Sequence, residues 1–154
     1  MNSVLISESE VYMRVKTVLK LDPLSKARLP MFTCPISAGQ PVHTEDYRDN
    51  DFDACLLTRH PDETFILPVE GDSMIDAHIC SGDWLVVDRA IEPSDGSIVV
   101  ASIDDELTVK RLRKRNGRIT LEPENDDYRP LHIAKHMELT IWGVVIKVIH
   151  DVEI

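Results

Sequence analysis

The chain has 154 residues, of which 43% are hydrophobic and 29% are charged, and its formal net charge at pH 7 is -10. This length suits one domain whose core is large enough to keep water out of a small active site. An acidic surface repels phosphate backbones, so we expect no direct DNA binding by the whole chain. No stretch is apolar enough for a signal peptide or a membrane span, so we expect a cytoplasmic protein.

The cysteines are far apart in the sequence and odd in number, which favours reduced thiols over a disulfide framework. They are Cys34, Cys55 and Cys80. No cysteine pair or histidine spacing is typical of a metal site, so we expect neither a metal nor a cofactor.

Residues 1–38 contain five basic and three acidic side chains, which gives +2 and leaves -12 for residues 39–154. We therefore expect an N-terminal arm followed by a single folded domain. Within the arm, residues 11–21 predict a short helix, which the prolines that follow would end. Residues 39–64 predict an extended connector with one helical turn at residues 52–57.

From residue 65 onward, short β-rich runs alternate with turn residues, which is typical of a mainly β domain. The expected strands are residues 65–69, 84–88, 97–103, 106–114, 118–122 and 139–150. Asn116-Gly117 is a strong hairpin signal, because a type I′ turn needs positive φ at both central residues. The sequence thus predicts an antiparallel sheet closed into a compact barrel-like body.

Ser73 lies in Glu-Gly-Asp-Ser-Met at residues 70–74, directly after the first expected strand. A sharp turn there would expose the serine hydroxyl beside backbone N–H groups, which can stabilise an oxyanion. Gly71 lets a substrate backbone approach closely. A serine in such a turn also commonly serves as the N-cap of a helix, so this feature alone leaves both interpretations open.

Lys110 lies in Leu-Thr-Val-Lys-Arg-Leu at residues 107–112, where strand alternation puts Thr108 and Leu112 on its face. If that face is buried, desolvation lowers the pKa of the amine, and a neutral amine can take a proton from a serine hydroxyl. The alternative is a solvated basic edge that discourages strand pairing, since five more basic residues follow by residue 118.

Ala38 and Gly39 lie where the basic arm meets the acidic domain. Small residues on both sides of a bond suit a protease with a shallow pocket, and an extended segment can enter an active site. The same dipeptide is also an ordinary flexible connector.

Taken in order, these motifs resemble the UmuD and LexA family of self-cleaving serine peptidases. The similarity continues through residues 81–83, 121–131 and 142–145, and it covers nearly everything from residue 32 to residue 150. The resemblance implies a LexA and signal-peptidase type of catalytic domain, with Ser73 as nucleophile, Lys110 as general base and Ala38-Gly39 as the cleaved bond. It also implies that the backbone N–H groups of Asp72 and Ser73 bind the oxyanion.

The 38 residues before the cut leave no room for a helix-turn-helix domain, so the UmuD-like branch is closer than a LexA-like or phage-repressor-like regulator. That branch implies a homodimer whose arms are removed in the SOS response to DNA damage after stimulation by the RecA filament. The shortened form would serve as an accessory subunit of a UmuC-like translesion polymerase.

Two other interpretations remain at this stage. The domain could be a dimeric polymerase-binding module with an idle dyad, or a signal peptidase, which needs a membrane anchor.

Overall fold

The structure is a computed structural model of the whole chain, and it describes residues 13–20, 28–32, 48–53, 57–133 and 137–152. Its first strands are β1 (Arg14–Val15), β2 (Leu19–Lys20), β3 (Arg28–Phe32), β4 (Arg48–Asp53), β5 (Thr64–Glu70) and β6 (Trp84–Asp88). They are followed by β7 (Ile98–Ile103), β8 (Glu106–Arg115), β9 (Arg118–Glu122), β10 (Leu131–His132) and β11 (Leu139–Ile149). Two short 3₁₀ helices are η2 (Pro61–Glu63) and η3 (Ile75–Ala77).

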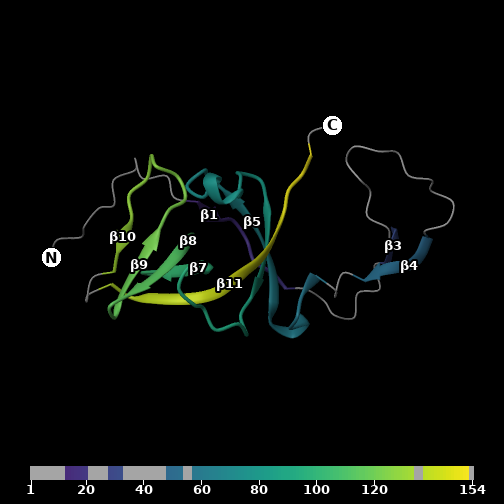
Figure 1. The fold of residues 1–154 in the computed structure, drawn as a ribbon, viewed down its shortest axis with the longest axis horizontal. Coiled ribbons are helices and arrows are strands. Elements are labelled where there is room, and N and C mark those ends of the chain that lie inside the picture. The colour runs from purple at the N-terminus through teal and green to yellow at the C-terminus, as the bar shows by residue number, and fades with distance from the viewer. Residues whose placement is uncertain (1–12, 21–27, 33–47, 54–56, 134–136, 153–154) are drawn as a thin grey trace.

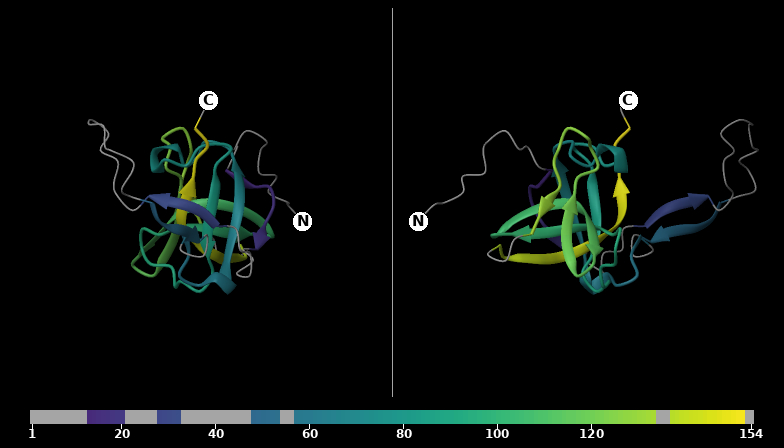
Figure 2. Two further views of the ribbon diagram at one scale, coloured as in Figure 1. Left: turned by 90° about the vertical axis from the view of Figure 1, so that its right-hand side faces the viewer. Right: turned by 60° about the vertical axis from the view of Figure 1, so that its left-hand side comes forward.

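The main sheet is antiparallel and runs in the order β1-β5-β6-β11-β7-β8-β9-β10, with β2 also paired to β5. Strand β1 pairs with β8 as well as with β5, so it closes the sheet into a ring. Figure 1 shows the resulting barrel, with β11 curving along it. Strands β3 and β4 pair with each other in a separate ribbon, which the right-hand view of Figure 2 draws apart from the barrel.

The core consists of two clusters of buried aliphatic side chains. The larger cluster contains Met13, Leu67, Val69, Met74, Ile79, Leu85, Val87, Val100 and Val109. The smaller cluster contains Val99, Ala101, Leu112, Leu121 and Val144. Because β-branched and leucine side chains dominate both clusters, the strands are stabilised mainly by packing of their inward faces. Within the described residues, no helix has the length and apolar character needed to cross a bilayer.

The expected barrel is confirmed, and all six expected strands are present. The hairpin between β8 and β9 has Arg115 opposite Arg118, with φ of 50° at Asn116 and 71° at Gly117. Both central residues therefore take the positive φ that the turn requires.

One local prediction is wrong. The helix expected over residues 11–21 is replaced by β1 and β2, which pair with the barrel. Of the helical turn expected at residues 52–57, Phe52 and Asp53 belong to β4, Leu57 has 3₁₀ conformation, and residues 54–56 lie outside the described residues. Without the arm, one edge of the seven-residue strand β5 would have unpaired backbone groups. Hydrogen bonds to this edge outweigh the weak local preference of the short arm segment for a helix.

Gly143 lies at an irregularity of β11, where the register with β7 shifts between Ile141 and Gly143. A Cβ at this position would lie 2.7 Å from Val87 Cγ1 and 3.3 Å from the Asp88 carbonyl oxygen. We expect Gly143→Ala to lower the free energy of unfolding by about 1–3 kcal/mol through overpacking, measured by urea denaturation. Thr140→Ala, at an exposed site of the same strand, is the control, and an equal midpoint for the two variants would contradict the expectation.

Candidate active site

Ser73 follows β5 in a tight turn that leads into η3. Gly71 has φ of 111°, a conformation that glycine adopts at little cost, and it redirects the chain at the end of the strand. The Ile75 N–H donates to the Asp72 carbonyl oxygen at 3.1 Å, which closes the turn around Ser73. The Ser73 side chain is fully buried and points inward. The sharp turn that the sequence predicted here is therefore confirmed, but the expected exposure of the serine hydroxyl is wrong, because Ser73 is fully buried.

Lys110 comes from the middle of β8. Its side chain is fully buried, and its neighbours on the same face, Thr108 and Leu112, are buried too. The two residues beside it in sequence differ: Val109 belongs to the larger core cluster, whereas Arg111 is only partly buried. Both faces of β8 are thus covered at Val109 and Lys110, and the buried one of the two interpretations that the sequence left open holds for Lys110.

The two side chains meet inside the protein. Lys110 Nζ donates to Ser73 Oγ at 2.8 Å and to the Val109 carbonyl oxygen at 3.0 Å. Burial lowers the pKa of Lys110 from 10.5 to about 8, because the charged form of the amine loses its hydration. A neutral amine is thus accessible near physiological pH, at hydrogen-bonding distance from a hydroxyl. This is the geometry that a general base and its nucleophile require.

The turn around Ser73 is held by the loop that follows β9. The Glu124 N–H donates to the Ser73 carbonyl oxygen at 2.8 Å, and Asn125 Nδ2 donates to the Asp72 carbonyl oxygen at 3.1 Å. The Tyr128 hydroxyl donates to the Asp72 carboxylate, and this bond raises the pKa of Tyr128 to about 12. The Asp72 carbonyl shares its peptide group with the Ser73 N–H, so the loop holds one of the two peptide groups expected to form the oxyanion site. The sequence motif at residues 121–131 pointed to this segment without revealing its positioning role.

A family model described as Peptidase S24-like matches residues 30–146 of the chain. The chain belongs to this family. Ser73 and Lys110 both lie inside the matched region. The bond between Ala38 and Gly39 also falls in that region, but it lies outside the residues that the structure describes.

Among the proteins that this S24 chain is similar to are several bacterial LexA repressors. The LexA repressor of Bordetella parapertussis is 42% identical over 116 residues, which cover 74% of this chain and 53% of that protein. The LexA repressor of Photobacterium profundum is 33% identical over 137 residues, covering 88% of this chain and 71% of that protein. The chain thus spans about half the length of the Bordetella relative.

Met13 is a member of this S24 site that sequence reasoning missed. Its side chain is fully buried in the larger core cluster, and its N–H donates to Ser73 Oγ at 3.2 Å. Its carbonyl oxygen accepts from the Thr108 hydroxyl at 3.3 Å. No local pattern could have revealed this contact, because it joins residues 60 positions apart.

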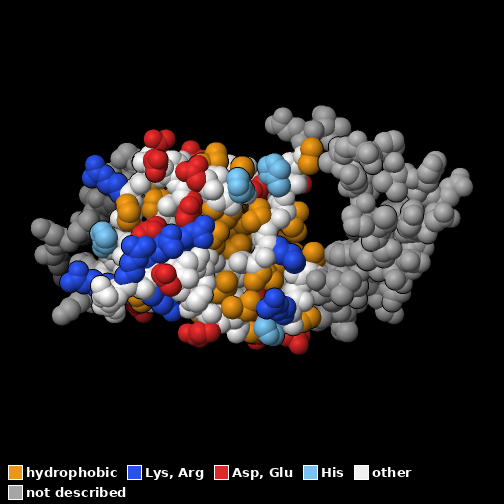
Figure 3. Space-filling model, in the orientation of Figure 1, with side chains coloured by type: hydrophobic (Ala, Val, Ile, Leu, Met, Phe, Trp, Pro, Cys, Tyr) orange, Lys and Arg blue, Asp and Glu red, His pale blue; other side chains and the backbone are white. Residues whose placement is uncertain are grey.

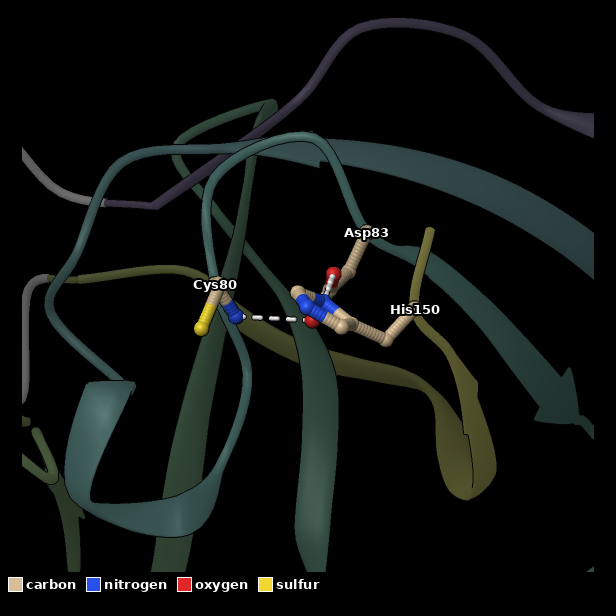
Figure 4. A group of neighbouring side chains, drawn as sticks. All are labelled: Cys80, Asp83 and His150. Carbon is tan, nitrogen blue, oxygen red and sulfur yellow. Dashed lines mark hydrogen bonds and ion pairs between the residues drawn. The ribbon is translucent and has the colours of Figure 1, made fainter. Parts of the chain in front are cut away.

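A second polar cluster joins the loop after η3 to the residue that follows β11 (Figure 4). It consists of Cys80, Asp83 and His150, whose donor atoms lie within 4.8 Å of one another. Asp83 accepts from the Cys80 N–H at 2.8 Å and pairs with His150 Nδ1 at 2.5 Å. Both carboxylate oxygens are thus engaged by protein groups, and Figure 4 shows the Cys80 sulfur directed away from them. We interpret the cluster as a clamp between this loop and the residue that follows β11, and assign no metal to it.

The basic residues near Lys110 form a separate surface feature. Figure 3 shows Lys and Arg side chains in a band over the region of β8 and β9. Arg111 and Arg113 pair with Glu124 and Glu122, whereas Lys114 is exposed. The solvated-edge interpretation is therefore wrong for β8, which pairs with β7 on one side and with β9 on the other, and Lys110 differs from these neighbours because it is buried.

Proposed function

We propose that this S24 chain is a self-cleaving serine peptidase, with Ser73 as nucleophile and Lys110 as general base, that cuts its own Ala38-Gly39 bond. One observation carries the proposal. The Lys110 amine lies 2.8 Å from the Ser73 hydroxyl, both side chains are fully buried, and burial brings the pKa of the amine to about 8. A fully buried lysine is costly to a fold, so its retention beside a serine favours a chemical role.

The reaction proceeds by acyl transfer. Neutral Lys110 takes the hydroxyl proton of Ser73, whose oxygen attacks the Ala38 carbonyl carbon. The N–H groups of Asp72 and Ser73 stabilise the negative charge that develops on the carbonyl oxygen. Lys110 then returns the proton to the leaving amine of Gly39, and water hydrolyses the ester on Ser73. The hydroxyl and the amine are restored, so no cofactor is consumed.

The physiological role that we propose is in the SOS response, with cleavage stimulated by the RecA nucleoprotein filament. The LexA names of the relatives and the motif resemblance support this assignment. Within the family we propose the UmuD-like branch. In that branch the shortened form is an accessory subunit of a UmuC-like translesion polymerase in the cytoplasm.

We also propose that the protein is a homodimer. Large apolar side chains are exposed at the C-terminal end of β11 and just beyond it, at Val148, Ile149 and Val152. Exposed apolar side chains close together in sequence are typical of protein contact surfaces. They support an interface without specifying its partner.

Intact-mass measurement tests the peptidase. Wild-type chain, incubated at alkaline pH with and without RecA filaments, is expected to lose residues 1–38, whereas Ser73→Ala is expected to stay whole because it lacks the attacking oxygen. Ser97→Ala, which changes a serine outside the dyad, is the matched control and should be cut like wild type. Equal truncation of all three chains, or of none, would exclude self-cleavage at Ser73. The second outcome would favour a non-enzymatic module with an idle dyad.

A further inference from the structure

Strand β1 fills the gap between the two strands that carry the dyad. β5 ends just before Ser73, and β8 contains Lys110. Among the described strands, β5 and β8 are bridged only by β1, in which Arg14 lies opposite both Glu70 and Thr108. A chain segment that approaches Ser73 as an extended strand would use this same gap. The arm therefore occupies the position next to the dyad where a peptide would bind.

The contacts of the arm continue along the edge of β5. The Lys16 N–H donates to the Pro68 carbonyl oxygen at 3.2 Å, and Leu19 and Lys20 pair with Ile66 and Phe65. The Lys16 and Glu70 side chains form an ion pair at 3.1 Å, but both are more than half exposed, so the pair contributes little. Binding of the arm thus rests on main-chain hydrogen bonds and on the buried Met13 side chain. This is how an extended peptide binds by adding a strand to a sheet edge.

The arm lies in the gap in an unreactive arrangement. A hydroxyl oxygen can accept two hydrogen bonds, and Ser73 Oγ accepts one from Lys110 Nζ and one from the Met13 N–H. It therefore meets an amide N–H, not the carbonyl carbon that it would have to attack. An incoming peptide also has to take the place of Met13 before its own carbonyl can reach Ser73.

We propose that residues 13–20 are an internal blocking strand, which fills the peptide site of the uncut chain and must leave before the bond at Ala38 can enter. The inference rests on the proposed self-cleavage and assigns its regulation. The ligand class of the site is an extended peptide with a large apolar side chain at the Met13 position. The rate of unstimulated cleavage is then set by the fraction of molecules in which β1 has detached.

Lys16→Pro tests the blocking strand without altering the core. It removes the N–H that binds Pro68, and the Lys16 side chain is exposed, so the barrel stays packed. Lys16→Ala loses the same side chain but keeps the N–H, so the difference between the variants reports the backbone hydrogen bond. We expect Lys16→Pro to cleave itself about 3- to 10-fold faster than Lys16→Ala without RecA, the factor that one hydrogen bond supplies. Equal rates, or a slower Lys16→Pro, would overturn the proposal.

A second measurement separates this inference from the proposed function. Hydrogen exchange of the amides of residues 17–20 is followed in the full chain carrying Ser73→Ala, with and without Lys16→Pro. Slow exchange that Lys16→Pro accelerates supports the docked arm, even if no variant cleaves itself and the peptidase assignment fails. Equally fast exchange in both chains overturns the blocking strand, even if wild type cleaves.

Discussion

Lys110→Met is expected to abolish self-cleavage and, at the same time, to raise the free energy of unfolding at pH 7 by about 1–2 kcal/mol. Burial lowers the pKa of Lys110 from 10.5 to about 8, which corresponds to a cost of roughly 3 kcal/mol for the charged amine in the folded state. Methionine has a similar length and no charge, so it removes this cost. Part of the gain is lost, because Ser73 Oγ and the Val109 carbonyl oxygen each lose a hydrogen-bond donor.

The direction of this effect depends on pH. Below about pH 8 the amine of Lys110 is protonated in both the folded and the unfolded chain, so the folded state bears the full free-energy cost of burying the charge. Between about 8 and 10.5 the folded chain releases the proton while the unfolded chain keeps it, so wild-type stability rises with pH. The advantage of Lys110→Met should therefore shrink over this range and disappear above it.

Urea denaturation at pH 7 and pH 10, with intact mass recorded in parallel, checks both halves of the expectation. Lys114→Met is the matched control, since it removes an exposed lysine from the same strand. It should leave both cleavage and stability close to wild type. A Lys110→Met chain that is less stable than wild type at pH 7 would show that the charged amine is not a burden to the fold.

Strand positions could be predicted because they are local properties of the sequence. Alternation within residues 106–114 put Lys110 on the same face as Thr108 and Leu112, and the structure buries all three. Asn116-Gly117 fixed the hairpin, because few other residue pairs adopt its backbone conformation at low cost. The distance between Lys110 and Ser73 was not predictable from spacing, and it entered only through resemblance to a family.

The secondary structure of the arm could not be predicted from its local sequence. Residues 11–21 have an acceptable pattern for a short helix, but a short isolated helix is only marginally stable in water. The structure instead uses Met13 as a core residue and places Arg14 between two strands that are distant in sequence. Tertiary contacts decide whether the arm forms a weakly preferred helix or pairs with an open sheet edge. These contacts involve distant residues, so they cannot be read from the sequence of the arm alone.

The pH dependence of cleavage tests the chemical role of Lys110 directly. If the neutral amine is the base, the rate without RecA should rise about tenfold from pH 6 to pH 7, because the neutral fraction grows tenfold per pH unit below the pKa. It should level off above about pH 8, where burial has placed the pKa of Lys110. First-order rates from intact mass between pH 6 and pH 10 give the profile, and Ser73→Ala at each pH corrects for background hydrolysis.

The shape of that profile also separates the base from the blocking strand. Detachment of β1 breaks main-chain hydrogen bonds that do not titrate in this range, so Lys16→Pro should raise the whole profile and leave its midpoint near pH 8. A midpoint near 10.5 would mean that the amine is solvated when cleavage occurs, and a flat profile would mean that no lysine acts as base. Either result would contradict a mechanism in which desolvation of Lys110 makes its amine available to Ser73.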